Sequence, residues 1–313
     1  MDAAVEKQIE DYIDGLVPEI PFATKEKIGR TTDYSMGRNR YIGYLMTLPT
    51  RAFKNLRVGL DCANGASSTV AKAVFDALGA KTYVINNTPD GTNINAGCGS
   101  THMEELMERV KAEKADVGLA FDGDADRLLA VDEKGNKVDG DQIMGIVGNY
   151  LKEQKKLKKD TIVATVMSNL GFFLMGEKQG IHMEQTKVGD RYVLERMRQI
   201  GANLGGEQSG HVIFLDENTT GDGLLSALHL LQVLVDTKKP LSELATIMEV
   251  LPQALVNAKV PNDKKNSYME NPQIADAIDA LTKKFAGEGR VLIRPSGTEP
   301  LVRVMIEGRD QNR

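Results

Sequence analysis

VGLAFDGDADRLLAV, residues 117–131, decides the fold of this 313-residue chain. An apolar run, VGLAF, is followed at once by three aspartates at alternate positions and then by a second apolar run, LLAV. Short apolar runs bounded by a polar turn are typical of buried strands. In a doubly wound sheet, ligands collect beyond the carboxyl ends of the strands, so we expect a functional site in the polar loop after VGLAF.

The residues before this stretch alternate between strand and helix patterns. Residues 56–62 (LRVGLDC) and 81–86 (KTYVIN) are short apolar runs, and residues 66–79 between them have helical periodicity. The helical pattern ends at Gly79, a residue type that commonly follows a helix. A strand, a helix and a second strand in this order predict a β-α-β unit.

A charged helix is expected between this unit and the VGLAF strand. It should run through Lys114, with Ser100 or Thr101 as its N-cap. Glu104 is placed to bond back to the cap residue, which would complete a capping box. The chain up to the aspartate loop therefore predicts one α/β domain.

The same alternation returns from about residue 139 and predicts a second α/β domain. Helices are expected at 141–154, from 169, from 190 and at 224–235, and strands at 161–166 and within 204–215. After Pro252 the pattern changes to a strand, a polar loop, a helix and two strands on either side of RPSGTEP, residues 294–300. This order predicts a smaller α+β domain.

Composition and charge argue against several classes of protein. The chain is 41% hydrophobic and 27% charged, which is typical of a folded protein with two or three domains. Its net charge of -5 argues against nonspecific binding to nucleic acid or acidic membranes, because both need a basic surface. No signal-peptide pattern is present, and the best apolar run, residues 224–235, is too short for membrane insertion. Cys62 and Cys98 indicate neither a disulfide framework nor a zinc site, so we expect a cytoplasmic location.

The aspartates of FDGDADR, residues 121–127, are the strongest functional signal. Like charges on one tight turn repel one another unless a cation holds them together, so Asp122, Asp124 and Asp126 predict a site for one divalent ion. Arg127 is placed to hold a phosphate that bridges to the same ion. A site with few protein ligands and a phosphate oxygen suits Mg²⁺.

Three other interpretations fit this loop less well. An EF-hand also begins D-x-D-x-D, but Arg127 occupies the position of its turn glycine and LLAV predicts a strand. A phosphatase of the haloacid dehalogenase type would use Asp122 as its nucleophile, but Asp126 and Arg127 stand where that motif has a hydroxyl-bearing residue. A solvated acidic turn has little need of three carboxylates directly after a buried strand.

GGEQSGH, residues 205–211, is the second signal. Its glycines suit a loop that approaches a sugar closely, and Glu207 is able to accept hydrogen bonds from two adjacent hydroxyls. Ser209 offers a further polar contact. His211 is available for proton transfer near neutral pH. Taken alone, the string also fits a plain turn with a polar tip.

RPSGTEPLVR, residues 294–303, is the third signal. It offers a guanidinium group, two hydroxyls and unencumbered backbone N–H groups, which together make a phosphate cradle unlike a P-loop. The candidate residues are Arg294, Ser296, Gly297, Thr298 and, in the following strand, Arg303. Taken alone, the string also fits a simple turn.

Single charged residues and histidines carry less weight. Lys187 and Arg191 in TKVGDRYV flank a glycine turn at a helix start, so they could meet a phosphate, although surface positions are equally ordinary for them. His229 lies in an apolar helix and is expected to be a satisfied core histidine.

DGDADR, GEQSGH and RPSGTEPLVR in this order resemble the α-D-phosphohexomutase superfamily, whose members place four domains around one cleft. Gln208, together with DCANGAS, PDGTNINAGCGSTH and TKVGDRYV, is most similar to the phosphoglucosamine mutase branch. The resemblance implies three-layer α/β/α domains followed by a smaller α+β domain. It divides the chain into the tail of domain I (1–36), domain II (37–137), domain III (138–250) and an incomplete domain IV (251–313).

The resemblance also implies an activity. Members of this branch interconvert glucosamine 6-phosphate and glucosamine 1-phosphate through a phosphoserine and glucosamine 1,6-bisphosphate, on the route to cell-wall precursors. Carried onto this sequence, the metal residues for one Mg²⁺ would be Asp122, Asp124 and Asp126, and the catalytic residues His211, Arg127, Lys187 and Arg191. The substrate-binding residues would be Glu207, Ser209, Arg294, Ser296, Gly297, Thr298 and Arg303.

One departure from the family pattern affects the expected activity. No Ser-His-Asn-Pro-like string, which holds the family's phosphoserine, occurs here, and Ser35 and Ser100 lack that context. We therefore expect a fragment without most of domain I and the extreme C-terminus, which is inactive alone. The alternatives are a non-catalytic module that binds sugar phosphates or a partner, and a phosphomannomutase/phosphoglucomutase. A homodimer would be typical of the family.

Overall fold

The structure is a computed structural model that describes residues 3–285, 289–296 and 299–309. The chain divides into two compact units, Met1–Arg40 and Tyr41–Arg313. The first unit contains helix α1 (Ala3–Ile13) and a segment whose regular structure before α2 is one short 3-10 helix, Lys25–Lys27. From residue 3 to residue 40 the large apolar side chains are exposed, as for Phe22 at 94%, so these residues form no core of their own.

The second unit begins within helix α2 (Ser35–Thr47) and contains a five-stranded sheet in the order β2-β1-β3-β4-β5. The strands are β1 (Arg57–Asp61), β2 (Lys81–Ile85), β3 (Val117–Phe121), β4 (Leu128–Asp132) and β5 (Lys137–Val138). Strands β2, β1 and β3 are parallel, whereas β4 and β5 are antiparallel. Helices α3 (Ala71–Ala77) and α4 (Glu104–Ala112) contact this sheet. VGLAF is the central strand and is buried throughout, which explains its unbroken apolar sequence.

A second sheet repeats the same plan in the order β7-β6-β8-β9. Its strands are β6 (Thr161–Thr165), β7 (His182–Thr186), β8 (Leu204–Gly206) and β9 (Val212–Phe214). Its helices are α5 (Gly140–Glu153), α6 (Leu170–Gln179), α7 (Asp190–Ile200), α8 (Gly223–Thr237) and the short α9 (Leu241–Leu244). Strands β7, β6 and β8 are parallel and β9 is antiparallel. The loops after β3 and β8 therefore occupy equivalent positions in the two sheets.

Two helices connect these sheets. Helix α5 begins beside the loop after β8, and helix α8 begins beside the loop after β3. The N–H group of Gly140, the first residue of α5, donates to the carbonyl of Gln208 at 3.0 Å. The N–H group of Gly223, the first residue of α8, donates to the carbonyl of Ala125 at 2.9 Å. A Cβ atom at Gly140 or Gly223 would lie within 2.5 Å of a backbone oxygen, so both helix starts require glycine. The two sheets share one hydrophobic core as a result.

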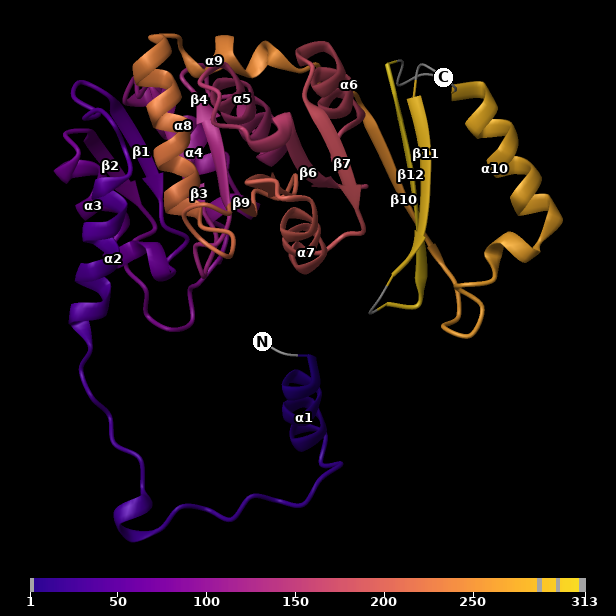
Figure 1. Ribbon diagram of the computed structural model, residues 1–313, viewed down its shortest axis with the longest axis horizontal. Coiled ribbons are helices and arrows are strands. Elements are labelled where there is room, and N and C mark those ends of the chain that lie inside the picture. The colour runs from indigo at the N-terminus through magenta and orange to yellow at the C-terminus, as the bar shows by residue number, and fades with distance from the viewer. Residues whose placement is uncertain (1–2, 286–288, 297–298, 310–313) are drawn as a thin grey trace. The chain divides into compact units, whose positions relative to one another are not determined.

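The C-terminal sheet is antiparallel throughout, in the order β10-β12-β11. It contains β10 (Gln253–Lys259), β11 (Gly289–Pro295) and β12 (Leu301–Gly308), and helix α10 (Pro272–Phe285) contacts β11. Figure 1 shows this sheet in orange and yellow beside its helix. The predicted fold class, consecutive α/β domains followed by a smaller α+β domain, is confirmed.

One local prediction is wrong. Ser100 and Thr101 do not cap a helix, because Gly99–Thr101 form a 3-10 turn, and α4 starts only at Glu104 without a side-chain cap. The capping box lies instead at the start of α5, where Asp139 and Gln142 bond each other's backbone N–H groups. Among the described residues, none of the helices combines the length and apolar character that crossing a membrane requires.

Candidate functional site

The aspartate loop after β3 gathers its three carboxylates at one point. One oxygen from each of Asp122, Asp124 and Asp126 lies within 4.8 Å of the others. The loop turns at Ala125, which has a φ of 63°, and its N–H group donates to the carbonyl of Asp122 at 3.2 Å. Asp124 is exposed, and the other two aspartates are half-buried. The structure therefore places the predicted metal residues together.

The aspartate loop carries more negative charge than positive charge. Burial raises the pKa of Asp122 to about 6, and the neighbouring carboxylates of Asp126 and Asp124 add to the effect. Burial also raises the pKa of Asp126, and the charge of Asp124 adds to the effect, although a hydrogen bond with Asp122 opposes it. Arg127 is the adjacent cation, with its Nε atom 3.9 Å from both Asp122 and Asp126. Three carboxylates facing one guanidinium leave room for a divalent cation, and oxygen ligands of this kind suit Mg²⁺.

The aspartate loop is supported from behind by the DCANGAS segment. The N–H group of Ala66 donates to the carbonyl of Gly123 at 2.8 Å. A Cβ atom at Gly65 would lie 2.1 Å from that same carbonyl oxygen, so only glycine allows this approach. Asp61, which is fully buried, holds the segment in place by accepting hydrogen bonds from two backbone N–H groups.

The loop after β8 is joined to the aspartate loop through the backbone. Arg127 and His211 form an isolated antiparallel β-bridge. Beside it, the N–H group of Leu128 donates to the carbonyl of Gly210 at 3.0 Å. Gly210 has a φ of 97°, a conformation that favours glycine. The second and first sequence signals therefore belong to one site.

His211 is buried between the two loops. Its Nε2 atom lies 3.4 Å from Oδ2 of Asp126 and 3.9 Å from Oδ2 of Asp190, and its Nδ1 atom has no hydrogen-bond partner among the described residues. Burial lowers the pKa of His211, although Asp190 opposes this effect. Gly221 packs against the ring so closely that a Cβ atom there would lie 2.4 Å from Nε2. A neutral imidazole in this position is able to accept a proton.

The sequence did not single out Asp190 or Gly221. Asp190 lies in TKVGDRYV, where Lys187 and Arg191 drew attention as the charges suited to phosphate. The sequence could have pointed to Asp190, because it lies between Lys187 and Arg191. Gly221 carries no chemical group, and only the fold shows that it contacts His211.

The TKVGDRYV turn reaches the loop after β8 through its backbone. The N–H group of Gly189 donates to Oε1 of Glu207 at 3.0 Å, and Glu207 is half-buried. Ser209 is exposed at the tip of the loop. Lys187 and Arg191 are exposed as well, and Arg191 forms an ion pair with the next turn of α7. The structure thus brings the turn to the site through the backbone of Gly189.

The residues of the third signal lie at the ends of β11 and β12. Arg294 and Arg303 are directly opposite each other, and the Nε atom of each is buried without a hydrogen-bond partner among the described residues. Burial lowers the pKa of Arg294, and Arg303 adds to the effect. Ser296 is buried, and its Oγ atom accepts from the N–H group of Glu299 at 3.1 Å. The other two candidates lie outside the described residues: Gly297 and Thr298.

His229 behaves as the sequence indicates. Its Nε2 atom lies 2.7 Å from Oε2 of Glu217, and its ring stacks on Phe214 with the centroids 3.9 Å apart. It is therefore a satisfied histidine of the helix α8 packing and is separate from the loops described above.

Models of three consecutive domains of one family match this chain. Residues 39–135 match Phosphoglucomutase/phosphomannomutase, alpha/beta/alpha domain II. Residues 139–251 match alpha/beta/alpha domain III, and residues 255–313 match the C-terminal domain of the same family.

Whole-chain comparisons agree. A phosphoglucosamine mutase of Ruminiclostridium cellulolyticum is 56% identical over 309 residues, which cover 99% of this chain and 69% of the relative. A phosphoglucomutase/phosphomannomutase family protein of Burkholderia thailandensis shares the fold with a TM-score of 0.71 at 23% identity, over 88% of this chain and 61% of the other.

An N-acetylphosphoglucosamine mutase of Aspergillus fumigatus, solved with GlcNAc-6P and magnesium, has a TM-score of 0.68 at 19% identity, over 87% of this chain and 66% of the other. The chain thus spans less than two thirds of these two solved chains. Because the domain models cover most of the chain and the curated relative is more than half identical, the chain belongs to the phosphohexomutase family of isomerases, with phosphoglucosamine mutases among its close relatives.

Proposed function

We propose that this chain supplies the metal-binding, sugar-binding and phosphate-binding parts of a phosphoglucosamine mutase. The reaction is the interconversion of glucosamine 6-phosphate and glucosamine 1-phosphate through a phosphoserine and glucosamine 1,6-bisphosphate. The single observation that carries the proposal is the β-bridge between Arg127 and His211, which makes one site of the aspartate loop and the loop after β8, called the sugar loop below. The identity of 56% to a phosphoglucosamine mutase supports the choice of sugar.

The aspartate loop would hold one Mg²⁺ ion through Asp122, Asp124 and Asp126. The clustered oxygens and the raised pKa of Asp122 fit a divalent cation. When bound, this ion neutralises negative charge on a phosphoryl group. Arg127 would orient that phosphoryl group with its guanidinium, which is 44% exposed beside the aspartates.

The loop after β8 would bind and deprotonate the sugar. Glu207 would accept hydrogen bonds from adjacent hydroxyls through the oxygen that Gly189 leaves free, and Ser209 would contact the sugar from the exposed tip. His211 would take the proton from the attacking hydroxyl, because burial lowers its pKa and so keeps the imidazole neutral and free to accept one. Lys187 and Arg191 would meet the phosphate that faces the aspartate loop.

The C-terminal sheet would hold the phosphate that is not reacting. Arg294 and Arg303 present two positive charges side by side, and an anion between them would remove their repulsion. Ser296 and the neighbouring Gly297 and Thr298 would complete the cradle. One fixed clamp of this kind lets either end of the sugar face the same phosphoryl donor.

Because the 313 residues contain no Ser-His-Asn-Pro-like string, we further propose that this chain alone binds the sugar phosphate without converting it. Calorimetry with Mg²⁺ and glucosamine 6-phosphate tests binding, with Glu207→Gln expected to weaken it and Glu177→Gln, an exposed site on α6, as the matched control. Phosphorus NMR of the same mixture, primed with glucose 1,6-bisphosphate, tests turnover. Conversion to glucosamine 1-phosphate by the purified chain would contradict the second proposal.

A panel of sugars separates the remaining alternatives. Tighter binding of mannose 6-phosphate or glucose 6-phosphate would indicate a phosphomannomutase/phosphoglucomutase. Binding without any role for Mg²⁺ would favour a non-catalytic sugar-phosphate module. The cytoplasmic location and the homodimer stay predictions.

A further inference from the structure

A buried ion pair lies where the C-terminal sheet meets the preceding α/β domain. Arg290 on β11 donates from Nε to Oε2 of Glu307 on β12 at 2.6 Å. The Glu307 side chain is fully buried, and that of Arg290 is 20% exposed. A buried carboxylate is costly unless its oxygens are hydrogen-bonded, so this pair must be well supported.

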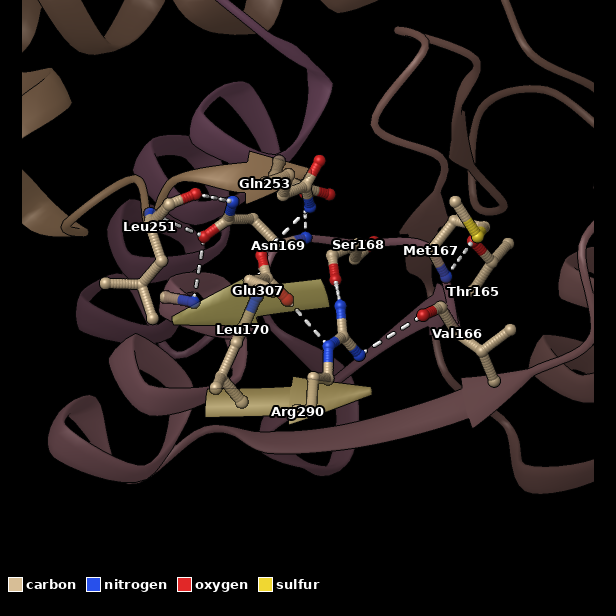
Figure 2. A network of polar contacts seen from close by, with 12 residues as sticks. Thr165, Val166, Met167, Ser168, Asn169, Leu170, Leu251, Gln253, Arg290 and Glu307 are labelled. Carbon is tan, nitrogen blue, oxygen red and sulfur yellow. Dashed lines mark hydrogen bonds and ion pairs between the residues drawn. The ribbon is translucent and has the colours of Figure 1, made fainter. Parts of the chain in front are cut away.

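Both members of the pair contact the α/β domain (Figure 2). Arg290 donates from Nη1 to the carbonyl of Val166 at 3.2 Å and from Nη2 to the carbonyl of Ser168, so its planar fork reaches the loop before α6. Oε1 of Glu307 accepts from the N–H group of Leu170, the first residue of α6, at 2.9 Å. The pair therefore fastens two strands of one domain to a loop and a helix start of another.

The segment that links the two domains is fixed at the same place. The side-chain amide of Asn169 donates to the carbonyl of Leu251 at 3.0 Å and accepts from the N–H group of the same residue at 3.0 Å. Gln253, the first residue of β10, donates from its side chain to Oε1 of Glu307 at 2.9 Å. Figure 2 shows these groups around one joint.

The same two strands carry the phosphate candidates. Arg290 is opposite Glu307, and four residues further along β11 Arg294 is opposite Arg303, with unbroken pairing between them. Side chains four residues apart in a strand lie on the same face, separated by about 13 Å. Met305, between the two pairs on β12, is buried, so the ribbon is packed along this length.

We infer that Arg290 and Glu307 are positioning residues for phosphate recognition. By fixing one end of the β11–β12 ribbon to the α/β domain, they hold Arg294 and Arg303 at a set place relative to the sugar loop. A tilt of roughly 10° at the joint would move the arginines by about 2 Å, and misplacements of about 1 Å are enough to weaken a two-point interaction. This inference rests on the proposed function, since it needs Arg294 and Arg303 to meet the substrate's phosphate.

Affinities for two ligands separate a positioning role from a structural one. Inorganic phosphate needs only the Arg294–Arg303 pair, whereas glucosamine 6-phosphate must reach both this pair and the sugar loop. In Arg290→Met we expect calorimetry to show phosphate affinity within about twofold of the original and sugar-phosphate affinity lowered about tenfold or more. Arg290→Lys should be intermediate, because an ammonium group cannot replace the planar fork. Lys283→Met, which removes one exposed charge from α10, is the matched control and should change neither affinity.

Equal losses for both ligands, or no loss for either, would overturn the inference. Spin labels at Lys178→Cys on α6 and Asp276→Cys on α10 provide a measurement that does not depend on the sugar. Arg290→Met should broaden the distance distribution between them, and an unchanged distribution would also overturn the inference. If the original chain binds the sugar phosphate no better than phosphate, the proposed function fails, while the label distances still decide whether the pair fixes the joint.

Discussion

Arg127 and His211 face each other across a β-bridge that connects the loop after β3 with the loop after β8. The two loops occupy equivalent places in two sheets, because β2-β1-β3-β4 of the first sheet and β7-β6-β8-β9 of the second follow the same order. The first residue of α5 bonds to the loop after β8, and the first residue of α8 bonds to the loop after β3. These hydrogen bonds hold both loops in place. The aspartate loop and the loop after β8 are therefore one structural unit although they are far apart in the sequence.

Gly210→Ala should damage this unit. Gly210 has a φ of 97°, and a Cβ atom there would lie 2.3 Å from the carbonyl oxygen of Leu128, the residue next to the bridge. We expect the Gly210→Ala chain to lose about 2 kcal/mol or more in the free energy of unfolding. Its affinity for Mg²⁺ should also weaken, because the bridge beside Gly210 supports the aspartate loop. Urea unfolding and calorimetry measure the two effects.

Gly91→Ala is the matched control, because Gly91 has a φ of 89° but open space around its Cβ position. It should lose about 1 kcal/mol from backbone strain alone and keep its Mg²⁺ affinity. Equal effects of the two substitutions would show that the bridge does not support the aspartate loop.

Asp124→Asn tests the metal site without disturbing the core, since Asp124 is exposed. The ion loses one charged ligand, so we expect Mg²⁺ affinity to fall about tenfold, or about 1.4 kcal/mol. The pKa of Asp122 should also fall, because Asp124 helps to raise it. Calorimetry and carboxyl NMR titration measure these changes, with Asp263→Asn at another exposed position as the control. An unchanged Mg²⁺ affinity would show that Asp124 does not bind the ion.

Local patterns were sufficient to predict most of the architecture. VGLAF is apolar at every position because β3 is a central strand, and helices α6 and α7 start at or next to Asn169 and Asp190, as expected. The edge strand β7, HMEQT, was missed because it is only partly buried and has no apolar run. The capping box at Ser100 was wrong because a 3-10 turn uses that residue.

Contacts between distant residues could not be predicted in the same way. The sequence indicated three separate loops, and each contains the residue types that its chemistry needs. The bridge at His211 and the approach of Asp190 and Gly221 to its ring depend on how two sheets pack, which no local pattern specifies. The joint at Arg290 was missed for the same reason.

The buried Asp141 should make stability depend on pH. Burial raises the pKa of Asp141 to about 7, and the charge of Asp139 adds to the effect, whereas an unfolded aspartate titrates near about 4. The folded state therefore keeps its proton to higher pH than the unfolded state. The resulting stabilisation is fully present below about pH 4 and is lost as the pH rises through about 7, by up to about 4 kcal/mol.

Asp141→Asn removes this titration. Urea unfolding measures the free energy of unfolding of the original chain and of this variant. The value for the original chain minus the value for the variant should fall as the pH rises from 4 to 8. The free energy of unfolding of Asp263→Asn, the exposed control, should change with pH as that of the original chain does over the same range. A constant difference between the original chain and Asp141→Asn would show that Asp141 titrates normally.

Arg303→Met should separate binding from stability at the phosphate residues. Arg303 lies opposite Arg294, and like charges in this position repel each other, so removing one should stabilise the phosphate-free chain by about 0.5 kcal/mol. The ion pair that Arg303 makes with Glu299 is largely exposed and offsets little of this gain. In phosphate buffer Arg303→Met should instead be less stable than the original chain. A ligand that binds only the folded state stabilises it more when its affinity is higher, and the variant should bind phosphate more weakly. Thermal unfolding with and without phosphate measures both effects, and Lys259→Met, an exposed charge on the same sheet, should leave the response to phosphate intact. A destabilised Arg303→Met chain in phosphate-free buffer would mean that Arg303 serves the fold, and the clamp would then rest on Arg294 and Ser296.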